Sequence, residues 1–156
     1  MVAFMKKILG NEYLLLVARL LVGFLFIVVG IGKIADPQLF AKEIANYRIL
    51  PDILVNLTAI IVPWVEVVSG LLLIAGVRLR ANAVLIGAML IMFNIFVFSA
   101  WARGLDINCG CYSNIAKQTV GLPKILENMG LLALAAIIFI FPKKALSLEN
   151  FSETNQ

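Results

Sequence analysis

The sequence predicts an all-α integral membrane protein, a four-helix bundle with a short interfacial helix between spans one and two. Hydrophobic residues make up 62% of the 156 residues and charged residues 14%, whereas soluble domains carry about 45–50% and about 25%. A core of this size cannot hide that excess, so the lipid bilayer must be the solvent. Because about 20 apolar residues cross a bilayer as a helix, the chain has room for four spans.

The apolar runs divide the chain into one membrane domain over residues 13–141 and two tails, 1–12 and 142–156. The four spans are expected at about 13–35, 53–77, 81–102 and 122–141. The first tail resembles the charged start of a signal peptide. The apolar run after it is too long for one and has no small-x-small cleavage site, which predicts a retained span.

The first span carries polar and small residues at spacings of three and four. These residues, which share one helical face, are Arg19, Gly23, Phe26, Gly30 and Lys33. Small residues on such a face allow another helix to approach closely.

Asp36 and Pro37 then begin the interfacial helix, as an N-cap and a first helical residue. Its apolar positions are Leu39, Phe40, Ile44 and Tyr47, and its polar positions are Lys42, Glu43 and Asn46. This amphipathic pattern is typical of a helix at the membrane surface.

The second span carries Glu66 near its middle, with Ser69 and Gly70 on the same face, and Pro63 is expected to kink it. Arg78–Arg80 forms a very tight turn, which makes spans two and three antiparallel neighbours. The third span is uncharged, and its expected inward stripe is Gly87, Ile91, Asn94, Phe98 and Trp101.

Lysine and arginine residues near the span ends predict the orientation. The two sides tie at six basic residues each, but those on the side of the termini are concentrated directly against the spans. We therefore expect a bacterial inner-membrane protein with both termini in the cytoplasm. The interfacial helix and the segment that follows span three then face outward. The net charge of +4 reflects this orientation and gives no reason to expect a nucleic-acid partner.

The polar gap between spans three and four contains the two cysteines of the chain, Cys109 and Cys111. Residues two apart in a turn fall within the Cα separation of a disulfide, about 4.4–6.8 Å, and Gly110 permits the tight backbone. A strained disulfide of this kind suits thiol exchange, and the nearby Arg103 favours the thiolate. The alternatives are a Cu(I) site made by the two thiolates and two inert buried thiols. The sequence identifies no other metal site.

Charged residues inside spans are costly and are usually paired or functional. Arg19 and Glu66 are expected either to pair between spans one and two or to leave Glu66 as a proton-handling or ligand site, with Asn94 at a similar depth. Lys33 and Glu127 are expected on the cysteine side, where they either pair structurally or tune the thiols. The aromatic residues near the cysteine gap, Phe98, Trp101 and Tyr112, suggest a quinone pocket.

Several spaced motifs run through residues 13–130. They are Arg19…Gly23-Phe24…Gly30…Lys33-Ile34-x-Asp36-Pro37…Phe40, then Tyr47-x-Ile49-Leu50-Pro51, then Pro63…Glu66…Gly70…Gly76, and last Arg103-Gly104-Leu-Asp-Ile-x-Cys109-Gly110-Cys111. The first three resemble the DoxX-like membrane proteins, and the last resembles the loop of the methylamine-utilisation branch, MauE. That branch often continues Cys-Gly-Cys-Phe-Gly, whereas Tyr112 and Ser113 follow here.

The resemblance implies a four-helix membrane protein associated with redox chemistry outside the cytoplasm. MauE is linked to maturation of methylamine dehydrogenase, for which disulfide formation is a suggested route. The sequence as a whole therefore favours thiol–disulfide exchange by Cys109 and Cys111 with an extracytoplasmic redox protein, with electrons passing to or from a quinone. The alternatives are a non-catalytic membrane subunit or assembly factor of an oxidoreductase complex, and a small transporter or Cu(I)-handling protein. A four-span transporter would be expected to form a homodimer.

Overall fold

The structure is a computed structural model that describes residues 12–105 and 122–141, and the regular structure of these residues is entirely helical. The helices are α2 (Glu12–Ala35), α3 (Pro37–Asn46), α4 (Asp52–Ala75), α5 (Leu79–Ala102) and α6 (Leu122–Ile140). Four of them are long and apolar enough to cross a membrane, and α3 is the short helix between the first two. The predicted all-α membrane bundle is confirmed.

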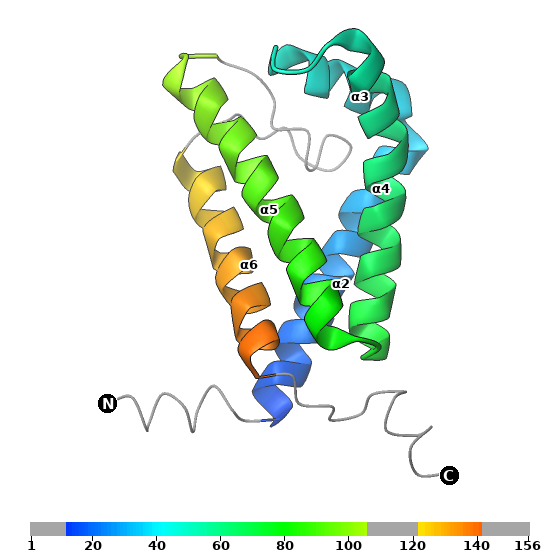
Figure 1. The fold of residues 1–156 in the computed structure, drawn as a ribbon, viewed down its shortest axis with the longest axis vertical. Helices are drawn as coiled ribbons and strands as arrows, with labels where there is room; N and C mark the ends of the chain where they lie inside the picture. The colour runs from blue at the N-terminus through cyan, green and yellow to red at the C-terminus, as the bar shows by residue number, and fades with distance from the viewer. Residues whose placement is uncertain (1–11, 106–121, 142–156) are drawn as a thin grey trace.

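The four long helices form two pairs, in which α2 packs along α4 and α5 packs along α6. Figure 1 shows that the pairs lie close together near the connection from α4 to α5 and diverge toward the end that carries α3. The C-terminal end of α5 and the N-terminal end of α6 also lie at this wider end. The two helix pairs are therefore farthest apart where the chain leaves α5 and returns at α6.

Glycines allow α2 and α4 to pack with their backbones almost in contact. A Cβ atom added to Gly70 would lie 2.7 Å from the carbonyl oxygen of Gly23, and one added to Gly30 would lie 2.9 Å from that of Pro63. On the same face of α2, Arg19 and Lys33 are buried. The close-packing face predicted for the first span is confirmed, and it exists because no side chain separates the two helices at these glycines.

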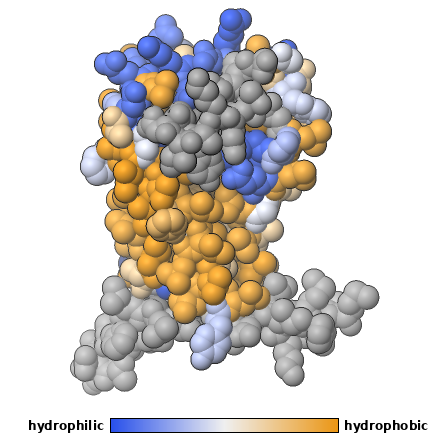
Figure 2. Space-filling model, turned by 180° about the vertical axis from the view of Figure 1, so that it is seen from behind, coloured by the Kyte–Doolittle hydropathy of each residue, from blue (hydrophilic) through white to orange (hydrophobic). Residues whose placement is uncertain are grey.

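Large apolar side chains cover the outside of the bundle, as expected for lipid contact (Figure 2). Hydrophilic residues gather at the end of the bundle that carries α3. The predicted inward stripe of α5 is wrong, because Ile91, Phe98 and Trp101 are 49%, 56% and 45% exposed. The buried face of α5 instead carries Leu79, Asn82, Ala83, Ile86, Leu90, Val97 and Ala100.

Short polar contacts fix the helix ends. The side chain of Asp36 accepts a hydrogen bond of 2.9 Å from the backbone N–H of Leu39, so the predicted N-cap of α3 is confirmed. Between α4 and α5, Gly76 and Arg78 have φ angles of 75° and 43°, and Asn82 Nδ2 donates to the carbonyl of Val77 at 2.7 Å. These contacts confirm the tight turn between spans two and three.

Candidate functional site

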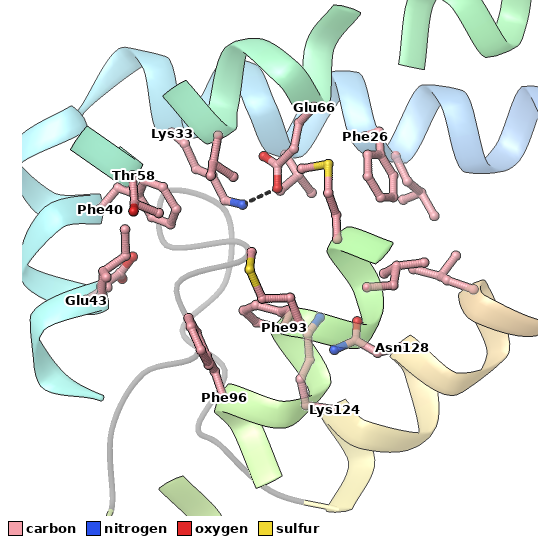
Figure 3. A pocket seen from close by; sticks show the side chains of 18 of the residues that line it. Phe26, Lys33, Phe40, Glu43, Thr58, Glu66, Phe93, Phe96, Lys124 and Asn128 are labelled. Atoms are coloured by element: carbon pink, nitrogen blue, oxygen red, sulfur yellow. Dashed lines mark hydrogen bonds and ion pairs between the residues drawn. The ribbon is translucent and has the colours of Figure 1, made fainter. Parts of the chain in front are cut away.

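A cavity of about 100 Å³ lies between the two helix pairs, at the α3 end of the bundle. Apolar side chains from α2, α3, α4, α5 and α6 form most of its wall. Its charged and amide-bearing members, which belong to α2, α3, α4 and α6, are Lys33, Glu43, Glu66, Lys124, Glu127 and Asn128. Figure 3 labels all of these except Glu127. A mostly apolar pocket with a few convergent polar groups is the usual form of a small-molecule site.

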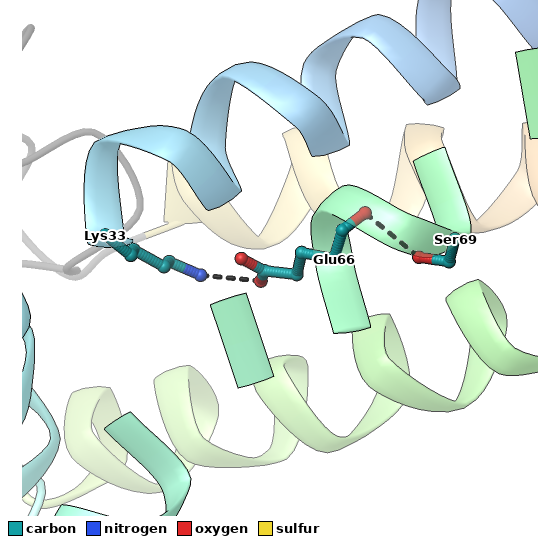
Figure 4. Close-up of polar contacts among 3 residues, drawn as sticks. All are labelled: Lys33, Glu66 and Ser69. Carbon is teal, nitrogen blue, oxygen red and sulfur yellow. Dashed lines mark hydrogen bonds and ion pairs between the residues drawn. The ribbon is translucent and has the colours of Figure 1, made fainter. Parts of the chain in front are cut away.

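Lys33 and Glu66 form an ion pair in the wall of this cavity. Lys33 Nζ lies 2.6 Å from Glu66 Oε1, and the two residues are 6% and 8% exposed. Figure 4 shows the pair bridging α2 and α4, with Ser69 Oγ donating to the backbone carbonyl of Glu66. Lys33 Nζ also lies 4.7 Å from the centre of the Phe40 ring, a distance at which the ring stabilises a cation. One ammonium group thus joins α2, α3 and α4.

This pairing differs from the two structural pairs that the sequence analysis considered. Arg19 with Glu66 was one alternative, beside a proton-handling or ligand site at Glu66, and Lys33 with Glu127 was another, beside a role in tuning the thiols. Both pairs are wrong, because Glu66 and Lys33 bind each other. The reason is the antiparallel register of α2 and α4, which places Gly30 against Pro63 and Val67. That register brings Lys33 near Glu66 and leaves Arg19 opposite the end of α4.

Arg19 stabilises the C-terminal end of α4. Its Nε donates to the carbonyl of Leu73 at 3.2 Å and its Nη2 to the carbonyl of Ile74 at 3.1 Å. Carbonyls in the last turn of a helix have no partner within the helix and carry partial negative charge. Burial of Arg19, which is 2% exposed, is therefore explained by a structural role.

The first two turns of α6 contribute a second polar group to the cavity. Lys124 Nζ lies 2.9 Å from Glu127 Oε2, and Lys124 and Asn128 are 4% and 3% exposed. Lys124 and Asn128 were not among the residues predicted to form a site. The signal was present, because polar residues at spacings of three and four share one face of a helix.

Glu43 is a further cavity residue that the sequence analysis did not select. It was assigned to the polar side of α3, but it is 5% exposed and lines the cavity. Phe40, Ile44 and Tyr47, at spacings that share its helical face, are also buried. A carboxylate within an apolar helical face was the available signal.

Arg103 connects the C-terminal end of α5 to the end of α3. Its Nη2 donates to the backbone carbonyl of Tyr47, which follows α3, and its Nε donates to the carbonyl of Ser99 at 3.1 Å. Asn94 lies on α5, and its buried amide atoms have no hydrogen-bond partner among the described residues. Phe98 and Trp101 lie on the exposed side of α5, so the aromatic rings in the cavity wall are others, including Phe40, Phe93 and Phe96.

Cys109, Cys111 and Tyr112 lie outside the described residues. The chain enters their segment after Leu105 and leaves it at α6, so both described flanks are at the cavity end of the bundle. Within residues 12–105 and 122–141, no group of three His, Cys, Asp or Glu side chains is arranged to hold a metal ion.

The chain is similar to known proteins over most of its length. A family model described as "Methylamine utilisation protein MauE" matches residues 11–141. The methylamine utilization protein MauE of Paracoccus denitrificans is 30% identical over 135 residues, which cover 86% of this chain and 73% of that protein.

Two further relatives have the same printed name. The MauE of Methylorubrum extorquens is 30% identical over 107 residues, covering 68% of this chain and 57% of that protein. The MauE of Methylophilus methylotrophus is 25% identical over 141 residues, covering 88% of this chain and 74% of that protein. No solved structure matches the chain. Together with the four apolar spans, the family match establishes that this multi-pass membrane protein belongs to the MauE family.

Proposed function

We propose that this chain is a redox-maturation protein of the bacterial inner membrane, in which Cys109 and Cys111 exchange a disulfide with an extracytoplasmic partner. Its relatives are named as methylamine utilization proteins, so we place the partner among the redox proteins of a methylamine-utilisation system. Both termini would lie in the cytoplasm, and the α3 end of the bundle would face outward.

The observation that carries this proposal is the position of the cysteine pair in the chain relative to the charged cavity. Both cysteines of the protein lie between α5 and α6, whose adjacent ends are at the cavity end of the bundle. Cys109 is four residues beyond Leu105, so covalent geometry alone limits the distance between the Cα atoms of Leu105 and Cys109 to roughly 14 Å. The described flanks of the cysteine segment thus lie at the end of the bundle that holds the cavity, which supports a functional unit made of both.

The proposed exchange transfers two electrons and two protons. A thiolate of the partner attacks the Cys109–Cys111 disulfide, a mixed disulfide forms, and the second partner thiol displaces it. The partner leaves with a disulfide, and this chain keeps two thiols. Regeneration then requires an electron acceptor in the membrane, for which we propose a quinone.

The test is replacement of each cysteine by serine. In Cys109→Ser and Cys111→Ser we expect exchange with a dithiol substrate to be lost, because neither variant can form the intramolecular disulfide. The bundle should stay folded, as measured by gel filtration in detergent. In intact cells, a membrane-impermeant maleimide should label the wild-type thiols only after reduction, which would support an oxidised pair on the outer face.

Other results would contradict the proposal. If the double serine variant still supported maturation of the partner, the chain would instead be a non-catalytic subunit or assembly factor. Labelling that requires cell lysis would place the cysteine pair on the cytoplasmic side or bury it.

A further inference from the structure

The cavity contains buried polar atoms whose hydrogen-bonding capacity is unused. Asn128 Nδ2 and Glu66 Oε2 are buried and have no hydrogen-bond partner within the described residues. The two residues are 3% and 8% exposed. A buried donor or acceptor without a partner is costly and rare. The cavity thus offers one unpaired donor from α6 and one unpaired acceptor from α4.

The space beside these atoms has the size of a single ring. At about 100 Å³, it is comparable to the engineered 150 Å³ cavity that binds benzene. The wall beside it is formed by Phe26, Met89, Leu90, Phe93 and Leu131. A ligand that fits must combine a flat apolar body with oxygen atoms on its edge, because the polar groups lie on helices of different pairs (Figure 3).

The cavity wall also reaches the outer surface of the bundle. Met92, which lines the cavity, is 42% exposed on α5. Thr58 and Val62 of α4, which line it as well, are partly exposed. A hydrophobic molecule dissolved in the bilayer would therefore meet the cavity between α4 and α5.

From these features we infer that the cavity binds the headgroup of a membrane quinone. Asn128 Nδ2 donates to an oxygen of the ring, and the free oxygen of the Glu66 carboxylate accepts from the hydroxyl group of the reduced form. Lys33 holds that carboxylate in place through its other oxygen. The site thereby has a partner for each redox form of the headgroup.

This inference rests on the proposed function for its electron source but not for binding. The bound quinone would take up two electrons and two protons, the number that Cys109 and Cys111 release when two thiols become one disulfide. The residues assigned here hold and orient the headgroup, and they lie apart in sequence from the cysteines. Binding and exchange can therefore be measured separately.

The test is thermal unfolding of the full chain in detergent at increasing concentrations of decylubiquinone. A ligand that binds only the folded state stabilises it by RT ln(1 + L/Kd), where L is the ligand concentration, so the Tm rises once this concentration exceeds the Kd and keeps rising with its logarithm. We expect this concentration-dependent rise in the wild type and, in Asn128→Leu, a Kd raised by at least about fivefold because the donor is lost. Leu131→Phe should abolish the rise in Tm for a steric reason, because the larger side chain fills the cavity.

The matched control is Asn94→Leu, since Asn94 also has a buried amide without a partner but is not part of the cavity wall. Its Kd should equal that of the wild type. The inference is overturned if the Tm of the wild type does not rise with decylubiquinone concentration, as expected for a cavity that holds only water, or if Asn128→Leu and Asn94→Leu behave alike. The double cysteine-to-serine variant should keep the shift and lose exchange, so failure of the proposed function is recognisable by itself.

Discussion

Replacement of Lys33 by methionine is expected to lower the free energy of unfolding by about 3–5 kcal/mol, the usual cost of removing one partner of a buried ion pair. The reason is that Glu66, which is 8% exposed, would be left without the ammonium group 2.6 Å away. The cation contact with Phe40 would be lost as well. Unfolding in detergent by increasing SDS, followed by circular dichroism, measures the change.

The double variant Lys33→Met/Glu66→Met distinguishes the net contribution of the ion pair to stability from the cost of leaving one buried charge without a partner. Hydrophobic replacement of both partners is often neutral or stabilising, so most of the loss should be recovered. Lys42→Met is the matched control, because Lys42 is exposed on α3. Equal losses in Lys33→Met and Lys42→Met would contradict the assignment of the ion pair.

Gly70→Ala is expected to destabilise the bundle by about 2 kcal/mol or more, within the range found for overpacked interiors. The added methyl group would lie 2.7 Å from the carbonyl oxygen of Gly23 and 2.9 Å from Ile27 Cγ1. Since a backbone oxygen cannot move away by changing a rotamer, α2 and α4 would have to separate. The measurement is again the SDS midpoint, together with the Tm in detergent.

Gly130→Ala, at another helical glycine, is expected to cause no loss of stability. A Cβ added to Gly130 of α6 meets no atom within 4 Å, and alanine is favoured over glycine in a helix by roughly 1 kcal/mol. This variant should therefore be as stable as the wild type or more so. If both substitutions were tolerated equally, the close contact of α2 with α4 would be wrong.

The type and number of the long helices could be predicted because uninterrupted apolar length is a direct requirement of the bilayer. The packed face of α2 could also be predicted, since Gly23 and Gly30 share one helical face with Arg19 and Lys33. The buried face of α5 could not. Lipid and a neighbouring helix are equally apolar surroundings, so Ile91 and Leu90 give the same signal although only Leu90 is buried.

The candidate site was predicted in part. Lys33, Glu66 and Glu127 were selected, and all three line the cavity, but the two pairs considered for them, with Arg19 and with each other, are not the pairs that form. The partner of a charged side chain depends on helix register and rotation, and register is set here by glycine contacts that act only after the helices meet. Glu43 and Asn128 were missed for a related reason, because a cavity forms between elements and is absent from each of them alone.

The connection from α4 to α5 has a mechanical consequence. Only Gly76, Val77 and Arg78 separate the two helices, and Asn82 donates a hydrogen bond to the carbonyl of Val77, so relative motion of α4 and α5 is expected to be smallest at this end. A helix of 24 residues such as α5 is about 36 Å long, and a tilt of about 5° at this end displaces its far end by roughly 3 Å. A small change of the angle between α4 and α5 would therefore move mainly the α3 end of the bundle, where the cavity lies, and leave the connected end almost in place.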